Sequence, residues 1–127
     1  MEVLNVDELA AQALTGSDAV TALLADGPAS VFHDYLPENN RYPAIQYADI
    51  TESPVLHADN AVLGVSKTIR VTVVDNTQTR RHAIKNAVLT AMKDAGFLWQ
   101  MTTNTRNGRE YYTSIDFYYL YEVNEVN

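Results

Sequence analysis

The chain has 127 residues, which suits one domain over residues 1–127 and is long enough to bury a core without disulfides or metal ions. Sixteen acidic residues against nine basic ones give a formal net charge of −7, and a field of that sign argues against general nucleic-acid binding. The absence of cysteine excludes disulfides and thiolate metal sites. The sequence shows no leader pattern and no apolar run of roughly 20 residues, so we expect a protein that acts outside membranes.

Two helical patterns occupy the first 30 residues. Apolar residues at helical spacing follow Asn5, which forms a candidate capping pair with Glu8, and Gly16 ends this first helix. Ser17 can cap a second, shorter helix, which we expect to continue through Leu24.

Two short strands are expected next, over residues 30–35 and 44–51, with a loop at residues 37–40 between them. Residues 52–64 keep neither a helical nor a strand period. We interpret them as a long connection or an extended hairpin arm, and segments of this kind are often used for contacts with other molecules.

The clearest alternation in the chain begins at Val65. One set of side chains is apolar and the other polar, as in a strand with one buried face: Val65, Ile69, Val71 and Val73 against Ser66, Thr68, Arg70 and Thr72. A helix over residues 77–95 is expected to follow, with candidate N-caps at residues 75–78 and a left-handed exit at Gly96. Its apolar stripe consists of Ile84, Ala87, Val88, Ala91, Met92 and Ala95.

The last third of the chain predicts a hairpin with strands over residues 97–103 and 110–122. Strands that come in a run, with a helix available to cover one face, indicate an α+β fold. We expect a mostly antiparallel sheet of about four to five strands, one long helix packed on one face, and short N-terminal helices.

The turn of this hairpin leaves two registers open. A two-residue turn at Asn107-Gly108 sets Trp99 opposite Asp116. A three-residue loop over residues 106–108 sets Trp99 opposite Ile115 instead, and only this register gathers the large apolar side chains on one face. The three-residue loop is therefore favoured.

Four phrases of the sequence, in this order and spacing, resemble those of one family. They are VFHDYLP (Val31 to Pro37), YPAIQY (Tyr42 to Tyr47), the strand and helix from Thr68 to Met92, and YYTSIDFYYLYEV (Tyr111 to Val123). With the N-terminal helical segment they cover nearly the whole chain, which resembles the tail-completion, or tail-terminator, proteins of long-tailed bacteriophages.

The resemblance implies a structural role. Members of that family form a ring, usually of six copies, which caps the finished tail tube of a phage or prophage and presents a face to the head connector. The implied partners are other copies of the chain, the tail tube protein and the head connector or stopper protein, while DNA passes through without specific binding and no membrane is involved. The implied location is the head–tail junction of the virion, after synthesis in the cytoplasm of the host bacterium.

A closed ring joins copies head to tail, so each subunit needs two different complementary patches. We expect one patch in the segment 52–64 and the other among tyrosines of the last strand, because tyrosine is favoured at interfaces. The candidate interface residues are Pro54, Val55, Leu56, His57, Asp59, Asn60, Tyr112, Tyr118 and Tyr121. The alternative interpretation is that these tyrosines are half-buried strand residues of a monomer.

Signatures of catalysis are lacking in the sequence. The three histidines, His33, His57 and His82, fall on different elements without an HExxH motif, and no phosphate-cradling glycine motif occurs. Asp116, in the middle of an apolar strand, is interpreted as a solvated or lumen-facing carboxylate. We therefore expect no enzyme, no metal and no cofactor. Two other functions stay open: a head-closure or connector protein of the same junction, and a small α+β ligand-binding or enzymatic domain.

Overall fold

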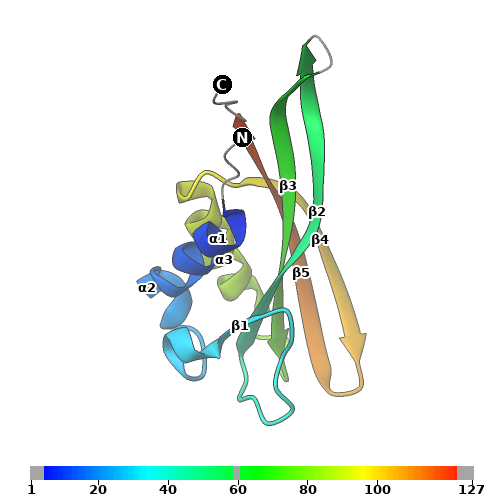
Figure 1. The fold of residues 1–127 in the computed structure, drawn as a ribbon. Helices are drawn as coiled ribbons and strands as arrows, with labels where there is room; N and C mark the ends of the chain where they lie inside the picture. Colours follow the sequence, from blue (N-terminus) through cyan, green and yellow to red (C-terminus); the bar gives the residue numbers. More distant parts are fainter. Residues whose placement is uncertain (1–4, 59–60, 123–127) are drawn as a thin grey trace.

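A five-stranded sheet forms the body of the protein in the computed structural model, which describes residues 5–58 and 61–122, with side chains for residues 5–54 and 64–122. The strands lie in the order β1-β2-β3-β5-β4 (Figure 1). Their bounds are β1 Val31–His33, β2 Ala44–Ala58, β3 Ala61–Asp75, β4 Leu98–Asn107 and β5 Glu110–Glu122. The helices are α1 Val6–Thr15, α2 Asp18–Thr21, the short 3-10 helix η1 Gly27–Ser30, and α3 Arg81–Asp94.

The sheet is mixed, which refines the expectation of a mostly antiparallel one. β1 pairs parallel with β2, with Val31 opposite Ile45, and the other three pairs are antiparallel. The α+β class is confirmed. None of the described helices is long and apolar enough to cross a bilayer.

Both predicted N-terminal caps are present. The side chain of Asn5 accepts a hydrogen bond from the Glu8 amide at 3.1 Å, and Ser17 accepts one from the Val20 amide at 3.3 Å. The second helix is shorter than expected, since α2 stops at Thr21 and η1 follows it.

The long helix begins later than the sequence suggests, at Arg81 rather than near residue 77. Asp75 is not available as an N-cap, because it accepts hydrogen bonds from the Asn76 amide at 2.8 Å and from the Arg80 guanidinium at 2.7 and 3.0 Å. The predicted exit is confirmed, with Gly96 at a φ of 97°.

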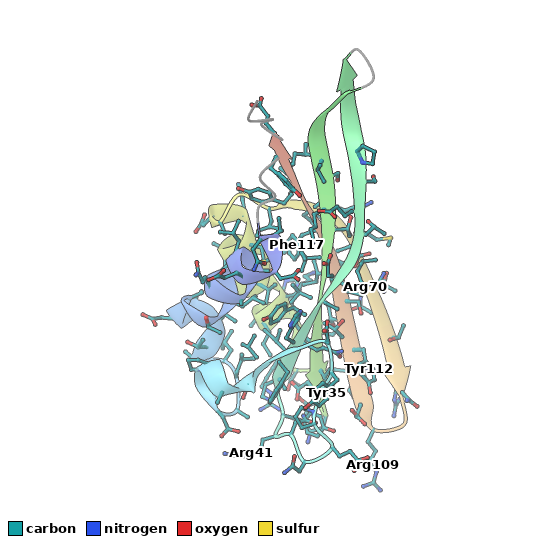
Figure 2. The ribbon with its side chains drawn as sticks, viewed as in Figure 1. Tyr35, Arg41, Arg70, Arg109, Tyr112 and Phe117 are labelled. Carbon is teal, nitrogen blue, oxygen red and sulfur yellow. The ribbon has the colours of Figure 1, made fainter. Side chains whose placement is uncertain are left out.

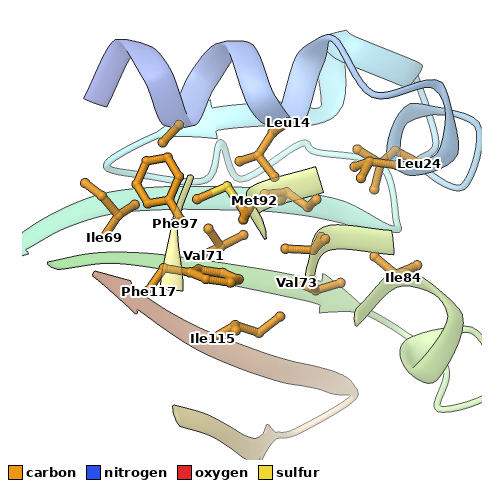
Figure 3. Packing of buried hydrophobic residues seen from close by; sticks show 14 of the residues in the cluster. Leu14, Leu24, Ile69, Val71, Val73, Ile84, Met92, Phe97, Ile115 and Phe117 are labelled. Carbon is orange, nitrogen blue, oxygen red and sulfur yellow. The ribbon is translucent and has the colours of Figure 1, made fainter. Parts of the chain in front are cut away.

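Two helices, rather than one long helix, supply the apolar layer over one sheet face (Figure 1). Figure 3 shows this packing, in which α1 and α3 lie over the apolar side of β3 and β5. The fully buried residues that the two helices contribute are Val6, Ala10 and Leu14 from α1 and Ile84, Val88 and Met92 from α3. Those from the side of the sheet that faces the helices are Ile45, Ile69, Val71, Ile115 and Phe117. The predicted alternation from residue 65 to residue 73 is confirmed.

Both registers expected for the last hairpin are wrong. Asn107 pairs with Glu110 around a two-residue turn whose first residue is Gly108 at a φ of 62°, the arrangement that a type II′ turn requires. A bulge at Gln100 then shifts the register, so that Trp99 lies opposite Phe117.

The segment over residues 52–64 is a hairpin arm and not a long connection. β2 and β3 stay paired as far as Ala58 opposite Ala61, with register shifts at three points along the way. β5 accompanies β3 only as far as Gly64, opposite Glu122, so the arm beyond that point has two strands in the described part of the chain. It projects past the helices at one end of the molecule (Figure 1).

Candidate assembly surface

The sheet face that points away from the helices carries an apolar patch. On β5, Asp116, Tyr118 and Leu120 alternate with residues that pack against the core, so they point away from the helices. Leu98 and Met101 of β4 lie opposite Tyr118 and Asp116 and therefore share this outer face. Leu98, Met101 and Leu120 are 46%, 50% and 52% exposed. Exposed apolar side chains that gather on one surface are typical of interfaces. We call this group, with the half-buried Tyr118, the outer patch.

A partly buried ion pair lies inside the outer patch. Arg70 of β3 donates from Nε and Nη2 to the two carboxylate oxygens of Asp116 on β5, at 2.8 and 3.2 Å. These hydrogen bonds raise the pKa of Arg70 above its ordinary value. The Asp116 side chain is 9% exposed and that of Arg70 is 44% exposed. Asp116 lies on the face away from the core, but the expectation of a solvated carboxylate is wrong.

Because the two partners differ in exposure, their removal is expected to cost different amounts. Arg70→Gln leaves the buried Asp116 carboxylate without its partner and is expected to lower the free energy of unfolding by about 2–3 kcal/mol. Asp116→Asn leaves a half-exposed guanidinium that water can solvate, so the loss is expected to be about 1 kcal/mol. Urea unfolding of both variants measures the difference, and an equal or reversed order would contradict this account of the pair.

Tyr112 lies on the same face but at a more crowded end of the sheet (Figure 2). Its hydroxyl donates to Glu110 at 3.0 Å, and Tyr42, from the segment between β1 and β2, lies beside both residues. Burial is the main cause that raises the pKa of Tyr112 above its ordinary value. The neighbouring Val74 of β3 is fully buried, so this end of the face is already covered.

Tyr121 lies on the other face of the sheet, against the core under the helices. Its hydroxyl donates to Glu52 at 2.9 Å, which ties the end of β5 to the base of the arm. Lys67 and Asp49 form a second link at 2.7 Å, within the same hairpin. The structure thus brings Tyr118 and Tyr112 to one face and separates Tyr121 from them.

The arm holds the remaining candidate residues. Pro54 is exposed on β2, and the backbone of Val55, Leu56 and His57 continues that strand. The side chains of those three residues, and the whole of Asp59 and Asn60, lie outside the described part of the chain. The arm candidates and the outer patch thus lie on different parts of one sheet.

The sequence predicted the strand β4 over residues 97–103, but the apolar surface along this strand was not among the candidate sites. Trp99 is 60% exposed and donates from Nε1 to the Thr102 hydroxyl at 2.9 Å. Beside it is an apolar hollow of about 290 Å³, lined by Leu89, Lys93, Phe97, Leu98, Trp99 and Phe117. The signal for it was the run Leu98-Trp99-Gln100-Met101, in which three large apolar residues stand in four positions without strict alternation.

Groups suited to catalysis do not converge in the described part of the chain. No cluster of three or more metal-ligating side chains occurs there. His33 stacks on Tyr47 with ring centroids 4.7 Å apart, and the apolar hollow contains a single ionisable side chain, Lys93. A second hollow, of about 360 Å³ between α1 and α3, likewise contains one, Asp94.

Comparison with known proteins gives two findings. Residues 10–119 match the family model described as tail completion protein gp17. A solved chain from the structure described as the virion of a native gene transfer agent particle is similar, with a TM-score of 0.61 and 15% identity. That match covers 90% of this chain and 92% of the other, and at this identity it concerns the fold alone. No curated protein matches this chain.

Proposed function

The chain belongs to the tail-completion protein family of bacteriophages, and on that premise we propose that it is a structural virion protein that closes the tail tube as a ring. The ring, of about six copies related by a closed rotation, would sit at the head–tail junction. One of its faces would contact the tail tube protein and the other the head connector. DNA would pass through its centre.

The observation that carries this proposal is the one-sided fold. Both helices lie on one face of the sheet, while the outer patch of Leu98, Met101, Tyr118 and Leu120 stays uncovered. The arm, formed by β2 and β3, projects past the helices at one end of the same sheet (Figure 1). These are two unlike surfaces on one subunit, which is what a head-to-tail ring contact needs.

The formal charge of −7 supports the same role in a weaker way. A wall with a negative field repels the phosphate backbone, so DNA can move past it without adhering. In the described part of the chain, four of the nine basic residues are held by acidic partners in the same subunit: Arg41 by Asp26, Lys67 by Asp49, Arg70 by Asp116 and Arg80 by Asp75.

Light scattering over a concentration series, followed by negative-stain imaging with and without purified tail tubes, tests the proposal. We expect single subunits when dilute, and rings at high concentration or on tube ends. A protein that stays a single subunit when concentrated, and does not decorate tube ends, would contradict it. Binding to isolated head connectors but not to tubes would favour a head-closure protein instead.

A further inference from the structure

We infer that neighbouring copies join by extending the sheet: the free edge of β4 in one subunit pairs, antiparallel, with the free edge of β2 in the next. This inference rests on the proposed ring and specifies its contact. The partner is a second copy of this chain, and the contact uses backbone hydrogen bonds as well as side chains.

Two long strand edges are unpaired in the described part of the chain. β4 has ten residues and pairs only with β5. β1 covers β2 only as far as Tyr47, so residues 48–58 of β2 pair on one side only, with β3. Unpaired edges of this length expose rows of amide and carbonyl groups, and folded proteins usually cover or pair them.

The strand directions make these two edges compatible. β2 and β3, β3 and β5, and β5 and β4 are all antiparallel pairs, so β4 runs opposite to β2 within one subunit. A rotation about an axis roughly along the strands preserves these directions. β4 therefore meets the β2 of the next copy in the antiparallel sense.

Charge favours unlike edges over like ones. Residues 98–107 contain Arg106 and no acidic residue, whereas residues 48–58 contain Asp49 and Glu52 and no lysine or arginine. Pairing two β4 edges would bring two copies of Arg106 onto one pair of strands, while β4 against β2 places Arg106 beside a strand that carries acidic side chains. The contact is thus head to tail, as a ring requires.

Full overlap of the two edges matches the faces of residues 102–105 with those of residues 51–54. Complete overlap of residues 98–107 with residues 49–58 sets Thr103 opposite Ser53 and Thr105 opposite Thr51. All four lie on the outer face within their own subunit: Thr103 pairs with Ser114, Thr105 with Tyr112, Ser53 with Ser66 and Thr51 with Thr68. Residues that are opposite each other in one sheet share a face, so the extended sheet keeps the outer face continuous.

The same register runs the neighbouring β2 past the apolar hollow beside Trp99. It sets positions 57 and 58 of that strand opposite Trp99 and Leu98, and positions 55 and 56, a valine and a leucine, opposite Met101 and Gln100. Binding by an added strand commonly combines backbone hydrogen bonds with pockets for alternate side chains.

The pairing also offsets adjacent copies along the strands, because the unpaired part of β2 extends toward the arm and β4 extends toward the opposite end (Figure 1). A closed barrel accommodates such an offset by tilting its strands.

Cysteine crosslinking tests the pairing, since the natural chain has no thiol. Thr103→Cys and Ser53→Cys are made as separate proteins, mixed at a concentration that gives rings, and oxidised. Opposite residues of an antiparallel pair have Cα atoms about 4.5–5.5 Å apart, within reach of a disulfide. The control replaces Ser53→Cys by Ala19→Cys, which lies exposed on α2. We expect the disulfide-linked dimer of Thr103→Cys and Ser53→Cys to form more than about tenfold faster than the dimer in this control. A subunit that carries both cysteines should give a series of disulfide-linked oligomers, up to the number of subunits in the ring.

The other results separate this inference from the proposed function. If imaging shows rings but neither the pair Thr103→Cys and Ser53→Cys nor the pair Thr105→Cys and Thr51→Cys crosslinks, the edge pairing is wrong, and the proposed ring is retained. Equally fast self-crosslinking of Thr103→Cys alone would indicate pairing of like edges and overturn the inference. Absence of both crosslinks and rings would overturn both proposals.

Discussion

Replacing Phe117 with alanine is expected to lower the free energy of unfolding by about 3–5 kcal/mol, among the largest losses for one side chain here. Phe117 is fully buried on β5 and meets Phe97 edge to face, with ring centroids 6.5 Å apart. The Phe97 amide donates to the Met92 carbonyl at the end of α3, so the cavity would open where the helix joins the sheet. Urea denaturation measures the loss as a lower midpoint concentration, with the slope of the free energy against urea concentration unchanged.

The matched control is the next residue along the strand. Tyr118 lies on the outer face, so Tyr118→Ala is expected to cost only about 1 kcal/mol while reducing ring formation. The two neighbours thus separate folding from assembly. A large loss of stability in Tyr118→Ala, or full assembly by it, would contradict the assignment of the outer patch as a contact surface.

The parts of the fold that were predictable are those whose cause is local. The alternation from Val65 to Val73 follows from one buried sheet face, and the caps at Asn5 and Ser17 depend on neighbours within three residues. The order of elements followed from the same signals. Local signals in the sequence are therefore sufficient to predict the α+β class.

The errors arose where distant or irregular contacts decide. Asp116 looked solvated because its partner, Arg70, is 46 residues away in the sequence. The register of the last hairpin depends on Gly108 opening the turn and on the bulge at Gln100, and neither leaves a periodic trace. The bulge also explains why the apolar run around Trp99 lacks the strict alternation of a strand with one buried face.

The sequence of the arm shows neither a helical nor a strand period, and the structure explains why. β2 and β3 shift register between Asp49 and Thr51 and twice more beyond Pro54, so alternation is interrupted in the sequence. Residues 51–54 are all exposed, which means that no buried face imposes a pattern there. From the sequence, segment 52–64 was either a long connection or an extended hairpin arm, and the pairing of β2 with β3 selects the arm.

Shortening the arm is expected to abolish ring formation without unfolding the subunit. Residues 54–65 are replaced by Asn-Gly, which joins Ser53 to Ser66 at a position where they already pair and suits a two-residue turn. The link from Tyr121 to Glu52 is retained. We expect stability to stay within about 1 kcal/mol, since a shorter connection costs little entropy. Light scattering should show that the protein concentration needed for ring formation rises more than about a hundredfold. This corresponds to a loss of about 2.8 kcal/mol in the free energy of association.

A second variant shows whether the new turn itself is harmless. Placing Asn-Gly at residues 108–109 introduces the same turn chemistry into the other hairpin and leaves the arm intact, so it should still assemble. If the shortened arm unfolds the subunit while this control folds, residues 54–65 belong to the stabilising core. If the shortened arm still forms rings, the contact between copies lies elsewhere. Because both variants keep the outer patch and β4, loss of assembly in the first alone assigns the missing half of the contact to the arm.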